Sequence, residues 1–519
     1  MKKILNVFLA LLALVSLTAC FAVNEVTSIE FTNAPSASYE QGVEVEAEDF
    51  SVIISFQFGD SLTLKLTDPR LTVTGLNGDL LDTRTIGRKT INISYQGFSV
   101  SVSYEVEGVY LTYWDAEDNR ASTITTLETF ESHSAGSAGI RNEAELAQFA
   151  YLVNQNPSAT RGKTYSLLGT YTFDLSAHEW IPITGFAGTL DGGGAIIKGL
   201  KISDGTDELP NKGFIGSTDA YHKDNNPNAK VIVKNLTFEE VFINSVTDGL
   251  GETNKNFAAV IGKTECETEI TNVIVKNSIF VSHGRLAAIV GQSNGGKLTI
   301  TNSKSLYNIF TAVNGYAAKS ADGNGDKVAG LVGQAQKEII ITNSSVENVT
   351  VNGTRDLGGL IGFAGAKTTL VNNNVDNTII QASVPGGMLP TKGTRSLGVF
   401  IGTIQSGENS SVEFGADNTY SNVQTLSNTN YQELSVKGVL FGGIRSTSNT
   451  TIRKAQSEIK IGDNTYLITT LVSPNADNIP EFAAQVAEIT EFLLAVYNGE
   501  SPAVPTAKSL IKVELKPVA

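Results

Sequence analysis

The chain has 519 residues, a formal net charge of −15 and only two cysteines. A chain of this length buries enough apolar surface to fold without a disulfide framework. Its acidic balance, with no basic tract at either end, excludes nucleic acid as a general partner of the whole protein.

The N-terminal segment predicts export and membrane anchoring. Lys2 and Lys3 precede an apolar run over residues 4–17, which has the length of a signal-peptide core but is too short for a membrane-spanning helix. The following Leu-Thr-Ala-Cys, which ends at Cys20, resembles the lipobox of bacterial lipoproteins. That resemblance implies a signal peptide over residues 1–20, lipidation of Cys20 and a lipid anchor that holds the protein outside the cytoplasm at the cell surface. An ordinary secretory signal, which would release the protein, is the alternative.

Residues 25–108 form a predicted first domain. Apolar and polar residues alternate over residues 62–66, 91–95 and 98–104, and this two-residue period is typical of half-buried strands. The Gly-x-x-x-Ile-x-Ile-x-Tyr-x-Gly spacing that begins at Gly87 resembles the bacterial immunoglobulin-like domains of surface proteins. The resemblance implies a β-sandwich that serves as a spacer or an adhesive module.

Two helices are predicted, one after residue 138 and one near the C-terminus. After a predicted linker over residues 109–138, Asn142 and Glu145 have the spacing of a capping box, and apolar residues recur on one helical face. A second helix is predicted over residues 478–497, inside a C-terminal cap region at 451–519. Such helices are suited to cover the apolar ends of a stack of strands. Docking of a partner is the alternative role for the second helix.

A short block of two small or apolar residues, two larger apolar residues and a glycine is repeated between the two helices. Its five copies close with the glycines Gly262, Gly291, Gly333, Gly362 and Gly402. Four of them are followed at similar distances by an asparagine: Asn272, Asn302, Asn343 and Asn372. Repeats of this kind predict stacked units, and we expect a right-handed parallel β-helix over residues 139–450 with coils about 4.8 Å apart.

The repeated residues suit the predicted coils. Asparagine tolerates left-handed backbone and bonds to asparagines in neighbouring coils, and a sugar-binding row is the alternative interpretation. Glycine suits places where the chain turns without room for a Cβ. The whole chain is therefore expected to be all-β, with an immunoglobulin-like sandwich, a parallel β-helix and helical caps.

The array resembles the GLUG-motif proteins, a family of bacterial surface β-helices named for this block. Residues 180–183 and 186–194, Trp-Ile-Pro-Ile and Phe-Ala-Gly-Thr-Leu-Asp-Gly-Gly-Gly, add to the resemblance. The chain departs from the pattern where alanine replaces the first glycine of three blocks. Members of the family include adhesins and protease-associated surface regions, and no catalytic residue is assigned to the motif. The resemblance therefore implies a surface role and supplies no catalytic residue.

A cation precedes each closing glycine by six or seven residues. If the coils stack in register, these cations would form a basic row along one vertex of an otherwise acidic protein and could bind an anionic glycan. The alternative is that charged residues mark the start of a strand and keep the surface soluble. The candidate ligand-binding residues are Lys255, Arg285, Lys327, Arg355 and Arg395.

Other patterns point only weakly to chemistry. Asp322, Asn324 and Asp326 alternate oxygen ligands in a way that suits calcium, but the segment lacks the glycine and the bidentate glutamate of an EF-hand loop. Asp191 is interpreted as an acid that caps backbone amides, and Cys266 as a small buried filler. No other cofactor is predicted.

These observations favour recognition over catalysis, because stacked repeats offer long binding faces and little pocket. We expect a membrane-anchored surface lipoprotein that acts as an adhesin or ligand-binding protein and contacts glycans or proteins. The first alternative is a carbohydrate-active enzyme, a polysaccharide lyase or glycoside hydrolase, which needs clustered acids in a groove. The second is a structural component of the envelope.

Overall fold

The computed structural model describes residues 24–40, 43–83, 87–107, 124–134, 139–169, 171–203, 211–218, 230–245, 255–282, 284–312, 327–382, 395–406, 410–427, 435–446, 455–472 and 479–516. The chain divides into two compact units, one N-terminal to residue 112 and the other C-terminal to residue 123. The predicted lipidation site, Cys20, lies outside the described residues. Within the described ranges, no helix combines the length and the apolarity needed to cross a membrane.

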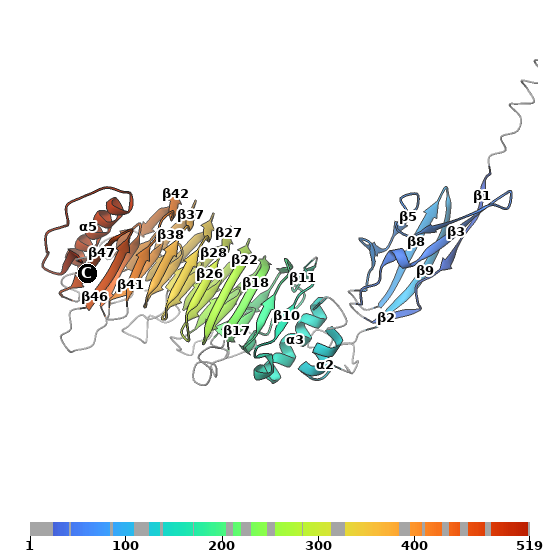
Figure 1. Ribbon diagram of the computed structural model, residues 1–519, viewed down its shortest axis with the longest axis horizontal. Helices are drawn as coiled ribbons and strands as arrows, with labels where there is room; N and C mark the ends of the chain where they lie inside the picture. The colour runs from blue at the N-terminus through green and yellow to red at the C-terminus, as the bar shows by residue number, and fades with distance from the viewer. Residues whose placement is uncertain are drawn as a thin grey trace, which may run out of the picture. The chain divides into compact units, whose positions relative to one another are not determined.

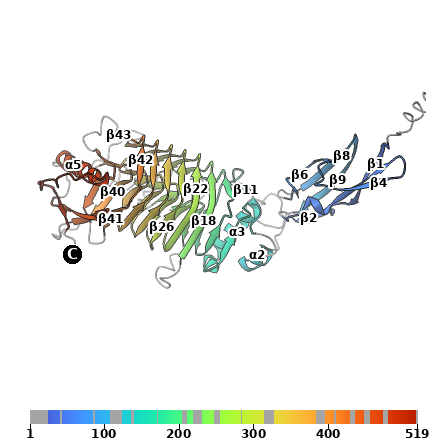
Figure 2. The same ribbon diagram turned by 45° about the horizontal axis from the view of Figure 1, so that its top comes forward.

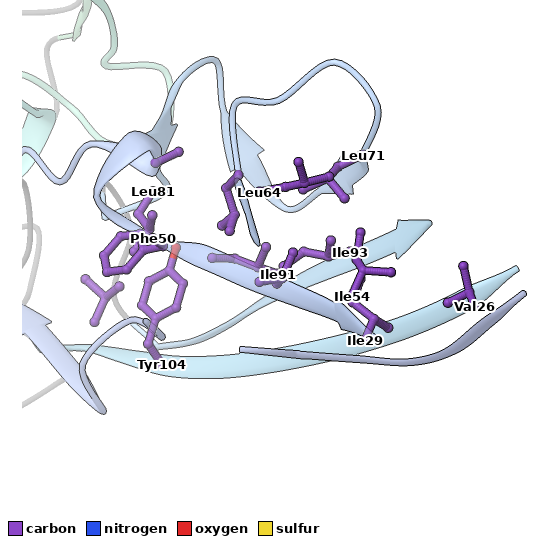
Figure 3. Packing of buried hydrophobic residues seen from close by; sticks show 14 residues of the cluster. Val26, Ile29, Phe50, Ile54, Leu64, Leu71, Leu81, Ile91, Ile93 and Tyr104 are labelled. Atoms are coloured by element: carbon purple, nitrogen blue, oxygen red, sulfur yellow. The ribbon is translucent and has the colours of Figure 1, made fainter. Parts of the chain in front are cut away.

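The first unit consists of two sheets around one core. Strands β1 (Val26–Asn33), β3 (Ser51–Phe56) and β4 (Ser61–Lys65) form one sheet, and the other contains β2 (Ser38–Glu40), β9 (Phe98–Glu107), β8 (Gly87–Tyr95) and β5 (Thr72–Thr74). A short pair, β6 (Leu76–Asn77) and β7 (Leu80–Leu81), and a 3-10 turn, η1 (Ala47–Asp49), complete the unit. Buried side chains from both sheets meet in the core, which Figure 3 shows from close by.

The predicted alternation is confirmed in this unit. Ile91 and Ile93 of β8 are fully buried, whereas Asn92 between them is exposed. Gln96 and Gly97 join β8 to β9 with φ angles of 47° and 88°, the left-handed backbone that a two-residue hairpin turn requires.

The second unit is a stack of parallel coils (Figures 1 and 2). A representative coil contains β24 (Arg285–Ala287), β25 (Val290–Ser293), β26 (Leu298–Thr301), β27 (Lys304–Leu306) and β28 (Ile309–Ala312). Each strand pairs in parallel with its counterpart in the next coil. Strands β26 and β27 belong to the same sheet, so the stack has four sheets, named below after β24, β25, β26 and β28. This arrangement of long parallel sheets is consistent with the predicted parallel β-helix.

The strands of each sheet follow chain order. The β24 sheet also contains β16 (Asn211–Lys212), β20 (Asn256–Ala258), β29 (Lys327–Ala329), β34 (Asp356–Gly358), β39 (Arg395–Gly398) and β44 (Ser435–Gly438). The β25 sheet also contains β12 (Ile183–Phe186), β17 (Ile215–Thr218), β21 (Ile261–Thr264), β30 (Val332–Ala335), β35 (Ile361–Ala364), β40 (Ile401–Ser406) and β45 (Phe441–Ser446). The β28 sheet also contains β15 (Lys201–Ser203), β19 (Phe242–Ser245), β23 (Ile279–Ser282), β33 (Thr350–Gly353), β38 (Ile379–Ala382) and β43 (Gln424–Ser427).

The β26 sheet is the longest of the four. Its first strands are β10 (Thr164–Ser166), β11 (Thr172–Asp174), β13 (Thr189–Asp191), β14 (Ile196–Lys198), β18 (Lys230–Glu239) and β22 (Glu267–Lys276). After β26 and β27 come β31 (Ile339–Thr342), β32 (Ser345–Glu347), β36 (Thr368–Val371), β37 (Asn374–Asp376), β41 (Ser411–Phe414) and β42 (Thr419–Ser421). The sheet closes with β46 (Ala455–Ile461), β47 (Asn464–Thr470) and β48 (Ile511–Leu515). Strand β47 pairs antiparallel with both β46 and β48.

The closing glycines form a column inside the β25 sheet. A Cβ at Gly362 would lie 2.6 Å from the carbonyl oxygen of Gly333, and a Cβ at Gly402 would lie 2.5 Å from that of Gly362. Neither glycine has a positive φ angle. The prediction that these positions have no room for a Cβ is therefore confirmed. The glycines lie inside strands β35 and β40, however, so close approach of neighbouring backbones requires them and a turn does not.

Asparagine occupies the turns, as predicted. Asn272, Asn302, Asn343 and Asn372 all have φ angles between 51° and 55°. The Nδ2 of Asn372 donates to the Oδ1 of Asn343 at 2.6 Å, which is a bond between neighbouring coils. A second series of left-handed turn residues, between the β26 and β28 sheets, was not predicted: Glu240, Asn277, Tyr307, Asn348, Asn377 and Asn422.

Both predicted helices lie at opposite ends of the stack (Figure 1). Helix α3 (Glu143–Gln155) packs on β12, beside the short helix α2 (Leu127–Ser134) and the turn η2 (Pro157–Thr160). Asn142 caps α3 by accepting a bond from the backbone nitrogen of Glu145 at 2.9 Å. Helix α5 (Ile479–Tyr497) packs on β44 and β45. Phe482, Val486, Ile489 and Leu493 form its buried stripe.

The stack continues beyond the predicted boundary at residue 450. Phe441 of β45 pairs with Ile401, so the segment Val439–Gly442 belongs to one more coil. Strand β46 still pairs in parallel with β41, and only then does the sheet turn antiparallel. Hydrophobic periodicity did not reveal this antiparallel end, because its strands lack the repeated block.

Candidate functional site

The five predicted ligand-binding cations do not form one row. The register of the β24 sheet pairs Arg285 with Lys327, and Lys327 with Asp356. The other three cations stand one residue before that column: Lys255, Arg355 and Arg395. Successive side chains of a strand point to opposite faces, so a one-residue offset changes the direction of a side chain. The prediction of one continuous basic row is therefore wrong.

The two cations of that column, Arg285 and Lys327, lie inside the stack, and Lys255 just before the column is buried as well. Arg285 and Lys327 are only 6% and 4% exposed. Arg285 donates from Nε to Oε1 of Gln334 and, at 3.2 Å, from Nη1 to Oδ1 of Asn256. The Nζ of Lys327 lies 5.6 Å from the centre of the Phe363 ring, which is a cation–π distance. Burial lowers the pKa of Arg285 to about 10, so its guanidinium is still charged at neutral pH.

The contacts of Arg285 with Gln334 and of Lys327 with Phe363 follow one rule: a side chain of the β24 sheet meets the β25-sheet side chain of the next coil. Asp356, fully buried, accepts a bond from the Oγ1 of Thr403 at 2.7 Å. A Cβ added at Gly443 would lie 2.0 Å from the Oγ of Ser396. The serine hydroxyl therefore occupies the space that a side chain at position 443 would need. Buried polar groups are costly unless they are partnered. We call the series Asn256, Arg285, Lys327, Asp356 and Ser396 the interior polar column.

The remaining predicted site residues are placed as follows. Lys255 is buried, Arg355 is half-buried, and the side chain of Arg395 lies outside the described residues. Asp322, Asn324 and Asp326 also lie outside them, so calcium binding stays a prediction. In the part of the chain that the structure describes, no three His, Cys, Asp or Glu side chains are grouped so that they could hold a metal ion. Binding of an anionic ligand by the cations also stays a prediction.

Two residues have the structural roles that were expected of them. Asp191 accepts bonds from the backbone of Gly193 and the Nδ2 of Asn235, and pairs with Lys234 at 2.9 Å. Burial alone would raise the pKa of Asp191, but these bonds together hold it below its usual range. Cys266 is buried, and its sulfur lies 3.5 Å from the Oγ1 of Thr218.

The outward face of the β28 sheet exposes a column of large apolar side chains. Phe242 pairs in register with Ile279, and Ile279 with Ile309. Their side chains are 38%, 44% and 46% exposed. The inward neighbours Phe280 and Phe310 are fully buried and stack with ring centres 4.7 Å apart. The outward column is therefore separate from the core of the stack.

In the next coils the same position of the register holds Thr350, Ile379 and Gln424, so the column is less apolar there. A second outward column runs beside it on the same sheet, two residues further along each strand: Asn244, Val281, Thr311, Asn352, Gln381 and Leu426. We call the two columns together the β28 face. The β28 face was not predicted from the sequence. A signal for it exists, because each residue of its first column follows a left-handed turn residue of the second series by two positions.

The outward face of the β26 sheet is different, because it carries charges in ion pairs between consecutive coils. Lys234 pairs with Asp191 at 2.9 Å, and Lys460 with Glu413 at 2.7 Å. Others are Lys230–Glu269, Lys276–Glu239 and Lys367–Glu338. Half-exposed threonines at 271, 299, 301, 342 and 369 lie between the charged positions. This face has the composition of an ordinary solvated surface.

Comparison with known proteins adds little to these observations. No protein-family model and no curated protein matches the chain. A solved structure described as "Solution structure of a putative surface protein" is similar at 20% identity, with a TM-score of 0.12; the match covers 17% of this chain and 92% of that one. At this level the match assigns neither a family nor a function to this chain.

Proposed function

We propose that the protein is a recognition protein of the bacterial cell surface that binds its ligand along the β28 face. The observation that carries the proposal is the register of Phe242, Ile279 and Ile309, which aligns three exposed apolar side chains in consecutive coils. Contiguous exposed apolar surface is costly in water and marks interaction sites. A long face without a pocket suits binding of an extended partner.

The first unit and the N-terminal signal complete the proposal. The lipobox-like Leu-Thr-Ala-Cys supports a lipid anchor at Cys20, with more than one acyl chain needed for stable attachment. The two mostly antiparallel sheets around one core, in which only β2 pairs in parallel with β9, support the resemblance of residues 25–108 to an immunoglobulin-like spacer. The GLUG resemblance of the stack supports a role at the cell surface.

The anchor is tested by labelling cells with a radioactive or alkyne-bearing fatty acid. We expect the wild-type chain to take up the label and to sediment with membranes. A Cys20→Ser variant is expected to take up none and to remain uncleaved or to appear in the medium. Label that persists in the Cys20→Ser variant would show that the attachment point is elsewhere.

Ligand binding is tested with the soluble chain of residues 23–519 on an array of glycans and extracellular-matrix proteins. The same mixtures are assayed for released reducing ends. We expect binding without product, and we expect it to be lost when Ile279→Asp and Ile309→Asp are combined. The matched control changes two half-exposed threonines of the β26 sheet, Thr299→Asp and Thr369→Asp, and is expected to bind normally.

Two outcomes would overturn this proposal. Release of reducing ends would identify a carbohydrate-active enzyme. Binding that survives in the Ile279→Asp, Ile309→Asp variant, with circular dichroism showing that both variants are folded, would move the binding site away from the β28 face.

A further inference from the structure

The β28 face carries no ionisable side chain from Phe242 and Asn244 to Gln424 and Leu426, among the residues that the structure describes. Strands β19 to β43 span five coil steps, which is about 24 Å at about 4.8 Å per step. The chain as a whole has a net charge of −15, and the neighbouring β26 sheet carries ion pairs between its coils. The absence of charge is therefore a local property of this one face.

The two columns of the β28 face differ in chemistry. The first column is apolar in four of its six positions, with Ile379 half-buried beyond the three exposed residues. The second column is mostly polar: Asn244, Thr311, Asn352 and Gln381 supply three amides and a hydroxyl, and Val281 and Leu426 are its two apolar members. An amide side chain both donates and accepts hydrogen bonds. The face thus offers a strip of apolar contact beside a strip of neutral hydrogen-bonding groups.

Tyr307 stands at the edge of this face in an unfavourable backbone conformation. Its φ angle is 55°, and the equivalent turns contain asparagine in four of the other five coils. Left-handed backbone is tolerated by asparagine but strained for a bulky residue. The ring of Tyr307 is also 60% exposed, so no burial offsets the strain. A strained residue whose side chain is mostly exposed points to a functional role.

Resting on the proposed function, we propose that the ligand of the β28 face is an uncharged, linear polysaccharide that lies along the axis of the stack. The C–H face of a sugar ring packs on Ile279, Ile309 and the ring of Tyr307, as apolar groups pack on aromatic faces. The hydroxyl groups of the sugar exchange hydrogen bonds with the amides of the second column. A chain of repeated sugars matches a face that repeats once per coil.

Charge decides between this ligand and an anionic one. From Phe242 and Asn244 to Gln424 and Leu426 the face provides no cation. The preceding strand β15 places Lys201 in register with Phe242, but Lys201 pairs with Glu179 at 3.0 Å. Two other basic side chains that could attract a polyanion, Arg285 and Lys327, lie buried in the interior polar column. Acidic residues on the adjacent β26 sheet, Glu347 and Asp376, would repel a polyanion from that side. An uncharged polysaccharide needs no cation on the face and is not repelled by these carboxylates.

The test uses the chain of residues 23–519 with cellohexaose, mannohexaose and xylohexaose as neutral probes and heparin as the polyanionic probe. We expect at least one neutral probe to bind in isothermal titration calorimetry, with an affinity that does not change between low and high salt. Tyr307→Asn is the decisive variant. It is expected to raise the thermal midpoint, because asparagine suits the backbone, and to weaken binding about tenfold.

Matched variants separate the two columns. Asn352→Ala and Gln381→Ala together are expected to lower the affinity for the neutral probe by about tenfold or more. Thr299→Ala on the β26 sheet is expected to leave that affinity unchanged. The inference would be overturned if the Tyr307→Asn variant were more stable than the wild type and bound the neutral probe with the same affinity. Binding of heparin alone, with an affinity that falls as salt rises, would overturn it as well.

Failure of this inference can be told apart from failure of the proposed function. If a matrix protein binds and the Ile279→Asp, Ile309→Asp variant does not bind it, the proposed recognition function is supported. The inference that the ligand is a polysaccharide is then overturned. If sedimentation shows a dimer that Ile309→Asp dissociates, the face is an interface between two copies, and the polysaccharide inference is overturned. If no ligand responds to changes in the β28 face, both proposals fail.

Discussion

The β26 and β28 sheets are consecutive walls of the same coils, yet their outward faces have opposite chemistry. On the β26 sheet, charges of opposite sign alternate between coils and form pairs such as Lys276–Glu239. On the β28 face, the equivalent positions hold aliphatic, aromatic and amide side chains. Both walls have the same parallel backbone pairing, so their outward residues are not needed to hold the stack together. The difference shows that outward positions are available for function once the interior and the backbone fix the coils.

The largest effect is expected from two neighbouring residues of β28, one of which points into the core and the other onto the β28 face. Phe310→Ala should lower the free energy of unfolding by about 3–5 kcal/mol, because it removes a fully buried ring that stacks on Phe280. Ile309→Ala, its outward neighbour in β28, should cost less than about 1 kcal/mol. Urea unfolding of both variants measures this. Equal losses would mean that the β28 face is part of the core and is not a separate binding surface.

A change in the glycine column should break the register on which both faces depend. Gly362→Ala places a Cβ 2.6 Å from the carbonyl oxygen of Gly333 and 2.9 Å from the backbone nitrogen of Val328. We expect a loss of about 2–3 kcal/mol from overpacking, measured by thermal and urea unfolding. Ala287→Gly, which removes a methyl group from another block, is the control and should cost about 0.5–1 kcal/mol. A neutral Gly362→Ala would show that the strands can separate without penalty.

The interior polar column should affect stability and leave surface binding unchanged. Arg285→Met keeps most of the side-chain volume but leaves Gln334 and Asn256 without the bonds that Arg285 donates. We expect a loss of about 1–3 kcal/mol in urea unfolding. Retention on a polyanionic column should not change. If retention falls and stability does not, Arg285 contributes to an anion-binding surface and the burial argument is wrong.

The smallest effect is expected on the charged β26 face. Lys276→Gln removes a half-exposed ion pair with Glu239 that has an N···O distance of 3.2 Å. Such pairs contribute about 0.2–1 kcal/mol at low ionic strength, and added salt screens them. The difference from wild type in urea unfolding should therefore shrink as sodium chloride is added. A difference that persists at high salt would indicate that Lys276 packs as well as pairs.

Sequence periodicity was sufficient to predict the stack and its two helical ends. The glycine block, the turn asparagines and the helical stripes at Phe149 and Phe482 repeat at periods that backbone geometry imposes. It was not sufficient to place the cations. Arg285 and Lys327 stand six residues before their glycine, whereas Lys255, Arg355 and Arg395 stand seven before theirs. Treating these two distances as equivalent merged two columns that point in different directions.

The sequence by itself determined the repeat, the turn positions and the polar or apolar character of each strand, because these depend on residues that are close along the chain. Only the tertiary structure decided which side chains meet across coils. Gln334 binds Arg285 from 49 residues away, and Thr403 binds Asp356 from 47. The loops between coils differ in length, so these partners have no fixed spacing in the sequence. The β28 face likewise exists only because parallel pairing brings Phe242, Ile279 and Ile309 into one column.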